Sequence, residues 1–357
     1  MGITMKGASL SLEHLPTELL EIIAIHVLQC SSLESLSCVN RAFRFICLPH
    51  MFEKLTVRFS LIGMEKLQQV SLSYISNYVK TICYKASEII DPLVQCPHYF
   101  STCLYTPLEY VRDEREFCWA YHGRQITYKR IYSYFKDLSE EQQAIIQADH
   151  DFMSFSSCLP RFLRLRSLEI CLTNNIEKPF RWFTGRMLVD WKNSFSDHLE
   201  AVLQGLCAAR ENGITIHTLQ VTGFYSRLPL VGSRVSSLAV CALHSVEELY
   251  LVDSPGLLDF IAATRLPSVR VLELENCWLQ VPELQKVLLT HGRTLEILHL
   301  ENVWLPSERF YDWGVSLSLG TTSTVVDGIS NIRTGEAMRE LTINRRGNKY
   351  EYRRTFS

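Results

Sequence analysis

Residues 246–305 carry the pattern that decides the fold. They contain three similar segments, VEELYLVDS (246–254), VRVLELENCWL (269–279) and LEILHLENVWL (295–305). The first leucine of each Leu-x-Leu pair is Leu249, Leu272 and Leu298, so the spacing is 23 and then 26 residues. Alternate side chains of a strand point to the same face, so the leucines of each segment predict a short strand that buries one face.

Fainter copies of the segment extend the pattern on both sides. They lie at Leu165–Ile170, His217–Val221, Val235–Val240 and Met338–Ile343, and Val79–Tyr84 predicts an earlier strand of the same sheet. Amphipathic helices are expected at 197–210, 256–265 and 282–291. The spacing resembles irregular leucine-rich repeats, which implies a solenoid with a parallel sheet on one face and helices on the other. An ordinary α/β domain with apolar strands is the alternative.

Alternation along these strands predicts two rows of side chains on the open face of the sheet. The central row is Glu169, Gln220, Ala239, Tyr250, Glu273, His299 and Thr342, and the next includes Val252, Glu275 and Glu301. Strands about 4.8 Å apart would gather Tyr250, Glu273, Glu275, His299 and Glu301. Because like charges repel, this acidic cluster suggests a Lys- or Arg-rich target segment. A phosphorylated segment fits this strip poorly, and a solvated sheet face or a metal site is the alternative.

The first sixty residues predict a small helical block with surplus apolar surface. Pro16 suits a first helical turn, and eight of the ten residues 19–28 are apolar, more than one buried face requires. Ser31 and Glu34 form a capping box for a second helix, and Asn40 can cap a third at 41–47, which Pro49 should stop. A strand is expected at 55–59. A block this small is marginal alone, so the surplus surface must pack on the rest of the chain or on another protein.

The order of residues in this block resembles the F-box, especially that of fungal F-box proteins. The matching run is Leu15-Pro16-x-Glu18-Leu19-Leu20-x-x-Ile23, then Leu28, then Leu33-x-x-Leu36-x-x-Val39-Asn40-Arg41-x-Phe43-Arg44-x-Ile46-x-x-Pro49-x-x-Phe52. The resemblance implies binding to a Skp-family adaptor and, through it, to the cullin scaffold of a cullin–RING ubiquitin ligase. It assigns adaptor-binding roles to Leu15, Pro16, Leu19, Leu20, Ile23, Leu33, Leu36 and Val39. Phe43 and Ile46 are assigned to the block's own core, and Cys30-Ser31-Ser32 stands where an Asp is often found.

These patterns divide the chain into four regions. Residues 1–10 are expected to form a loose leader, 11–60 the F-box and 61–150 a mixed helical connection. Residues 151–357 are expected to form the leucine-rich-repeat-like region that binds a target protein. Within it, residues 314–330 contain ten Gly, Ser or Thr among seventeen and predict a flexible insertion. The expected fold class is therefore α+β/α/β, a helical F-box followed by an irregular solenoid with a parallel sheet.

Composition excludes several classes of function. There are 36 basic and 38 acidic residues, and this balance argues against a protein that coats nucleic acid. The twelve cysteines form no CxxC pair, which argues against a zinc site or a disulfide framework and favours the cytosol or nucleus. No apolar stretch reaches the roughly 18 residues of a membrane span. No Walker loop, GxGxxG, GxSxG or HExxH motif occurs, so we expect no cofactor, metal or catalytic residue.

The predicted function is a non-catalytic substrate receptor of an SCF-type ubiquitin ligase, whose target remains unknown. A scaffold that binds the adaptor without recruiting a cullin is the first alternative. A thiol enzyme using Cys118 and His122 and a single-stranded RNA site in the aromatic stretch Tyr121–Tyr134 are the others.

Overall fold

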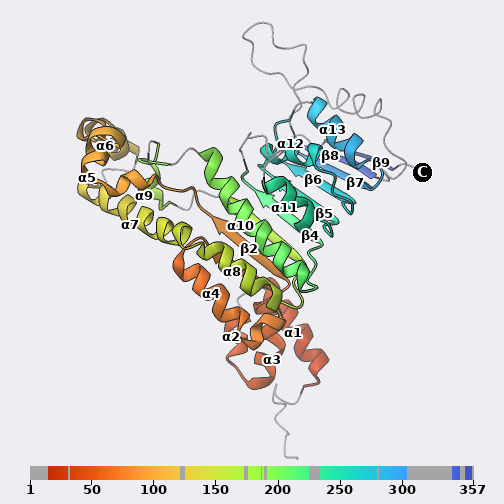
Figure 1. The fold of residues 1–357 in the computed structure, drawn as a ribbon. Helices are drawn as coiled ribbons and strands as arrows, with labels where there is room; N and C mark the ends of the chain where they lie inside the picture. Colours follow the sequence, from red (N-terminus) through yellow and green to blue (C-terminus); the bar gives the residue numbers. More distant parts are fainter. Residues whose placement is uncertain are drawn as a thin grey trace, which may run out of the picture.

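A nine-stranded sheet runs through the computed structural model, with its strands in the same order as in the chain (Figure 1). The structure describes residues 15–30, 33–120, 125–172, 176–185, 187–188, 191–224, 234–279, 281–303, 340–345 and 350–355. The strands are β1 (Lys54–Arg58), β2 (Thr81–Ala86), β3 (Ser167–Leu172), β4 (Thr218–Thr222), β5 (Glu248–Val252), β6 (Val271–Glu275), β7 (Ile297–Glu301), β8 (Glu340–Arg345) and β9 (Tyr350–Thr355). Strands β1 to β8 pair in parallel and β9 is antiparallel to β8. The predicted α/β class with a parallel sheet is confirmed.

In the described part of the chain, three helices precede β1 and the others lie in the connections between successive parallel strands. They are α1 (Thr17–Cys30), α2 (Leu33–Ser37), α3 (Arg41–Met51), α4 (Leu61–Ser71), α5 (Pro97–Tyr99), α6 (Pro107–Ala120), α7 (Tyr128–Gln147), α8 (His150–Cys158), α9 (Lys178–Arg181), α10 (Trp191–Glu211), α11 (Arg234–Ala242), α12 (Gly256–Ala263) and α13 (Val281–His291). Four short 3-10 or π turns lie at Tyr74–Asn77, Pro92–Gln95, Phe100–Leu104 and Leu159–Arg161. The helices expected at 256–265 and 282–291 are present, and the helix expected at 197–210 begins earlier, at Trp191.

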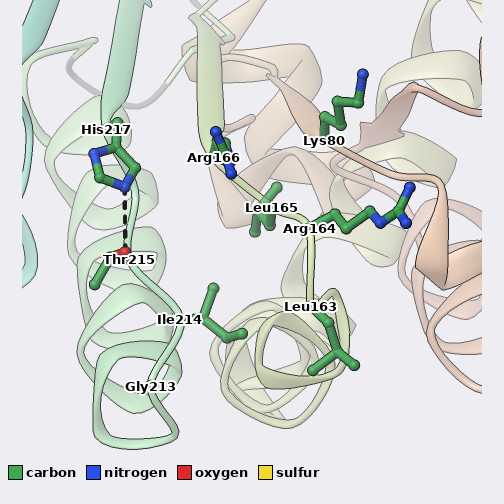
Figure 2. Close-up of a pocket in the computed structure, with 9 residues that line it drawn as sticks. All are labelled: Lys80, Leu163, Arg164, Leu165, Arg166, Gly213, Ile214, Thr215 and His217. Atoms are coloured by element: carbon green, nitrogen blue, oxygen red, sulfur yellow. Dashed lines mark hydrogen bonds between the residues drawn. The ribbon is translucent and has the colours of Figure 1, made fainter.

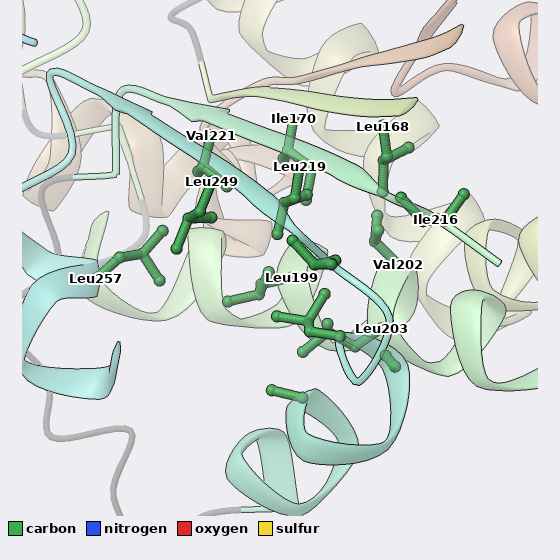
Figure 3. Packing of buried hydrophobic residues seen from close by; sticks show 14 of the residues in the cluster. Leu168, Ile170, Leu199, Val202, Leu203, Ile216, Leu219, Val221, Leu249 and Leu257 are labelled. Atoms are coloured by element: carbon green, nitrogen blue, oxygen red, sulfur yellow. The ribbon is translucent and has the colours of Figure 1, made fainter. Parts of the chain in front are cut away.

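The largest core lies between the sheet and the helices that cover it. Leu168, Ile170, Leu219, Val221 and Leu249 point from β3, β4 and β5 towards α10 and α12, and all are buried (Figure 3). Each parallel strand from β3 to β7 alternates buried and half-buried positions, as the sequence pattern predicts. Burying one such leucine or valine contributes about 1.5–3 kcal/mol, so each member of this row stabilises the packing of the helices on the sheet.

A recurring turn ends the strands β4 to β7. The residue after each strand has a positive φ: Gly223 (83°), Asp253 (49°), Asn276 (52°) and Asn302 (51°). Glycine, aspartate and asparagine are the residues that adopt this conformation at least cost. A Cβ at Gly223 would lie 2.2 Å from the Leu172 carbonyl oxygen, so that turn requires glycine. The next residue of two turns, Ser254 and Cys277, is buried and hydrogen-bonds backbone carbonyls of its own strand and of the strand before it.

One predicted strand is wrong. The sequence pattern predicts a strand at 235–240, but these residues lie in α11. The reason is the spacing of the apolar side chains: Val235, Ala239 and Ala242 are buried at intervals of four and three, which is the period of a helix. Ala239 therefore does not belong to a row on the sheet.

A second core, rich in aromatic side chains, is built from the long connections on either side of β3. Phe100, Phe117, Phe135, Phe180 and Phe183 are buried in it, and helices α5, α6, α7 and α9 form a lobe at one end of the molecule (Figure 1). Buried Gln142 of α7 accepts a hydrogen bond from the Ile90 N–H and donates to Ser87 and Glu88, which ties the lobe to the segment after β2. Residues 61–150 thus contribute both to the sheet and to a separate lobe.

Helices α1, α2 and α3 form a third core of their own. Leu20, Ala24, Leu33, Phe43 and Ile46 are buried in it. Asn40 caps α3 as predicted, because its side chain accepts the Phe43 N–H at 2.8 Å. The expectation that Pro49 stops this helix is wrong: α3 continues to Met51, where the Phe52 N–H still reaches the Leu48 carbonyl. The predicted leader 1–10, the Ser31 cap and the insertion 314–330 lie outside the described residues.

Candidate functional site

The surface of α1 to α3 carries a set of exposed apolar side chains, here called the N-terminal apolar face. Its members, with exposed fractions of 44–71%, are Leu19, Ile22, Ile25, Leu28, Val39 and Phe45. Four of them follow each other at intervals of three along α1, on the side opposite the buried Leu20 and Ala24. This arrangement leaves one side of α1 in the three-helix core and the other available to a second polypeptide.

The eight residues predicted to bind an adaptor divide between this face and the core beneath it. Leu19 and Val39 are on the face, and Pro16 is also exposed. Leu20 and Leu33 are buried in the three-helix core. Leu15, Ile23 and Leu36 are half-buried and pack against that core. The resemblance alone did not single out Ile22, Ile25 and Phe45, although the three-residue spacing in α1 was a signal for the first two.

The strand register gathers the predicted target-binding residues on the sheet. Tyr250 pairs with Glu273, which pairs with His299, and Glu275 pairs with Glu301 in the next row. With Ala239 removed, the central row becomes Thr56, Cys83, Glu169, Gln220, Tyr250, Glu273, His299 and Thr342. All five predicted side chains are half-buried. We call this group of five the acidic cluster.

The electrostatics of the acidic cluster favour a cationic ligand. Burial raises the pKa of Glu273, the neighbouring His299 lowers it, and the charges of Glu275 and Glu301 raise it further. A positive charge placed between these carboxylates would therefore be stabilised. Tyr250 donates a hydrogen bond to Glu248 at 3.2 Å, and Asn276 donates to Glu275 at 3.3 Å, so both rows are held in place. Within the described chain, the ligand atoms of the cluster do not come close enough together to form a metal site.

A second constellation, missed by the sequence reasoning, lies on the same face at β2 and β3. Cys83 and Cys171 come from strands far apart in sequence, yet their Sγ atoms are 3.8 Å apart. The two Sγ atoms and a carboxylate oxygen of Glu169 all lie within 4.8 Å of one another. By this spacing the three residues could hold a metal ion such as Zn²⁺. However, Lys54 Nζ lies 2.6 Å from Glu169 Oε2 and would compete with any cation. Thiol chemistry fits this site better than metal binding does.

The pKa values of the two thiols shift in opposite directions. The hydrogen bond from Cys83 lowers the pKa of Cys171 to about 7, with smaller help from Lys85 and Lys54 and against the effect of burial. The same hydrogen bond and burial raise the pKa of Cys83. Of the two, Cys171 is therefore the thiol that ionises at the lower pH, and the thiolate is the nucleophilic form.

Alkylation of Cys171 is expected to become faster as the pH rises from 6 to 8 and to level off above about 8, because the thiolate fraction follows its lowered pKa. The rate is measured by mass spectrometry of the labelled peptide. Exposed Cys241 serves as an internal reference. The Cys83→Ala variant, which removes the thiol that stabilises the thiolate, should shift the profile towards higher pH. A Cys171 profile that keeps rising steeply beyond pH 9 would contradict the assignment.

The remaining sequence candidates are not assembled into sites among the described residues. Cys118 lies on α6 and is half-buried, and its proposed partner His122 falls in a part of the chain that the structure does not describe. Of the aromatic stretch, Tyr128, Tyr132 and Tyr134 pack against the second core. Tyr134 stacks on Phe180 with ring centres 3.8 Å apart, so that face is not available to a base.

No protein-family model matches the chain, and no curated protein matches its sequence significantly. None of the helices in the described part of the chain combines the length and apolar character needed to cross a membrane.

Proposed function

We propose that this chain is a non-catalytic substrate receptor of an SCF-type ubiquitin ligase in the cytosol or nucleus. Its three-helix block, which resembles an F-box, would bind a Skp-family adaptor, and the adaptor would connect it to a cullin. The sheet and its helices, as an irregular leucine-rich-repeat-like solenoid, would hold the target protein.

The N-terminal apolar face is the observation that carries this proposal. The block has its own core of Leu20, Ala24, Leu33, Phe43 and Ile46, so it does not need the exposed side chains for its internal packing. Phe45 is 71% exposed and Ile22 is 50% exposed. An apolar face of this kind, on a block that is otherwise packed, is typical of a protein interface.

The acidic cluster supports a role in holding a target. Glu273, Glu275 and Glu301 lie on adjacent strands of a rigid sheet, with Tyr250 beside them. A target segment with lysine or arginine side chains would neutralise these carboxylates and stack on the tyrosine ring. Such a receptor needs no catalytic residue, because tethering raises the effective concentration of the target near the ubiquitin-conjugating enzyme.

A scaffold that binds the adaptor without a cullin is the alternative function. It would use the same N-terminal apolar face, which is why the face alone does not distinguish the two. The distinction lies in the composition of the complex: a receptor recovers both adaptor and cullin, whereas a scaffold recovers the adaptor alone.

Affinity capture with the proteasome blocked tests the proposal with three baits. The wild-type chain is expected to recover adaptor, cullin and targets. Leu15→Ala/Pro16→Ala should lose the adaptor and cullin but keep the targets, whereas Glu275→Lys/Glu301→Lys should lose the targets but keep the ligase. Recovery of the adaptor without cullin would favour the scaffold. If no Skp-family adaptor is recovered, or if both variants recover everything that the wild type does, the proposal is wrong.

A further inference from the structure

A row of charged side chains runs along the edge of the sheet where the parallel strands begin. The residue before each of the strands β1 to β7 belongs to it, and we call it the edge row: Glu53, Lys80, Arg166, His217, Glu247, Arg270 and Glu296. Each carbonyl accepts the N–H of the next member, for example Arg166 N to Lys80 O at 2.9 Å and His217 N to Arg166 O at 2.8 Å. The backbone thus fixes these residues at the strand spacing of about 4.8 Å.

Six of the seven members of the edge row form pairs with a neighbour. Lys80 is 3.0 Å from Glu53, and His217 is 3.2 Å from Glu247. Arg270 makes two bonds to Glu296, at 3.0 and 3.1 Å. The seventh member, Arg166, lies between Lys80 and His217 in the row. Lys80 is paired with Glu53 and His217 with Glu247, and neither acid is next to Arg166. Within the described chain, the Arg166 guanidinium has no acidic partner.

A pocket opens at this unpaired arginine. Its volume is about 530 Å³, and Lys80, Arg164, Arg166 and His217 supply its polar side chains together with Thr215. Figure 2 shows Arg166 between His217 on one side and Lys80 and Arg164 on the other. Like Arg166, Arg164 makes no ion pair with any residue that the structure describes. Leu163, Leu165 and Ile214 add an apolar wall.

We infer that this pocket binds a phosphoryl group carried by a peptide segment. Two guanidinium groups without carboxylate partners match a phosphate monoester, whose three oxygens can accept paired N–H bonds. Lys80, although paired with Glu53, adds a third positive charge at the side. Both ring nitrogens of His217 are already bonded, to Thr215 and Glu247, so this residue forms part of the wall. The apolar wall of Leu163, Leu165 and Ile214 suits an apolar residue next to the phosphorylated one. This differs from the acidic cluster, which offers carboxylates and no arginine fork.

The charges around the pocket confine the ligand to a single phosphoryl group. Glu53 and Glu247 lie on either side of the cationic stretch in the edge row and would repel the successive phosphates of a nucleic acid strand. The net charge of −2 gives the chain as a whole no general attraction for nucleic acid phosphates. A phosphorylated side chain on a protein brings one dianion and fits between the two acids.

Arg270 provides a matched control, because it occupies the same position of the edge row on β6 and already has Glu296 as its partner. The probe is a peptide library with a fixed central phosphoserine, compared with the same library carrying serine and with inorganic phosphate. Binding is measured by fluorescence polarisation on the full chain. The wild type is expected to bind the phosphoserine library at least tenfold more tightly than the serine library. Arg164→Gln/Arg166→Gln should remove this preference, whereas Arg270→Gln should keep it.

Three results would overturn the inference. They are equal binding of the two libraries, an equal loss in Arg270→Gln and the double variant, and binding of inorganic phosphate without any phosphopeptide binding. Circular dichroism of each variant checks that the fold is kept. The inference rests on the proposed function in one respect, which is that the phosphoryl group belongs to a target protein. Because the peptide assay needs no adaptor, a failure of phosphopeptide binding and a failure of adaptor binding are distinguished.

Discussion

The Ile22→Glu/Ile25→Glu double variant is expected to bind a Skp-family adaptor at least 100-fold more weakly than the wild type, with an unchanged melting temperature. Both side chains are about half exposed in the free chain, so the fold loses little when they change. In a complex, each would bury apolar surface at the centre of the interface, and a carboxylate there would have to be desolvated without a partner. A 100-fold loss corresponds to about 2.8 kcal/mol, which is modest for two central anchors.

Calorimetry with purified adaptor and thermal unfolding of each variant provide the measurement. Val240→Glu/Leu289→Glu is the matched control, because these side chains are 45% and 68% exposed but lie on α11 and α13, away from the three-helix block. The control should bind the adaptor as the wild type does. Wild-type affinity in the Ile22/Ile25 variant would show that the N-terminal apolar face is not the adaptor site.

The second large effect is a loss of stability in acid that depends on His198. This residue of α10 is buried against β2, with Nδ1 3.1 Å from the Tyr84 hydroxyl and Nε2 2.9 Å from the Ser87 carbonyl. The carbonyl can only accept, so Nε2 carries the proton and Nδ1 accepts from Tyr84. Burial lowers the pKa of His198 from 6.5 to about 4, although the bond to Ser87 opposes this.

Below pH 6.5 the unfolded chain protonates His198 while the folded chain does not, so stability is complete above about 6.5 and falls as the pH drops towards 4. The difference between 6.5 and about 4, at about 1.4 kcal/mol for each pH unit, gives a loss of about 3 kcal/mol by pH 4. His291, whose pKa burial also lowers, acts in the same direction. Asp151 and Asp197, whose pKa values burial raises, act in the opposite direction.

Urea unfolding at pH 8 and pH 4 isolates the contribution of His198 when the wild type is compared with His198→Gln. The variant is expected to be less stable at pH 8, because its packing changes, but to lose about 3 kcal/mol less than the wild type on acidification. Exposed His150 supplies the control, since His150→Gln should follow the wild-type profile. If the wild type and His198→Gln lose the same stability between the two pH values, His198 is not the group responsible.

The sequence was a good guide where one periodicity dominated. Leu272 and Leu274 alternate with polar residues, so β6 and the row containing Glu273 followed from the two-residue period. Residues 235–240 misled because Val235, Leu238 and Val240 match the spacing of the strand segments, whereas the side chains that are buried, at 235, 239 and 242, follow the helical period. The positive-φ turns were visible as Gly223, Asp253, Asn276 and Asn302, but their shared role becomes clear only when the strands are aligned.

The other sites depend on contacts between distant segments, which no local pattern encodes. Cys83 and Cys171 are 88 residues apart and meet because β2 and β3 pair. In the sequence, Arg166 resembles any surface arginine. Only the strand register shows that its neighbours Lys80 and His217 have acidic partners, whereas Arg166 has none among the described residues. In the aromatic lobe a helical period marks α7, whose buried residues recur every three or four positions. The contacts of α7 with the short turns and helices around it join distant segments, which a local period does not encode.

The match between strand order and chain order has a consequence for biosynthesis. From β1 onward, every new strand pairs with the one made just before it, so its partner has already left the ribosome. Translation can therefore extend the sheet one strand at a time. Among the first seven strands the longest interval precedes β3, because 80 residues separate it from β2. A nascent chain that has reached β7 already contains both the acidic cluster and the pocket at Arg166.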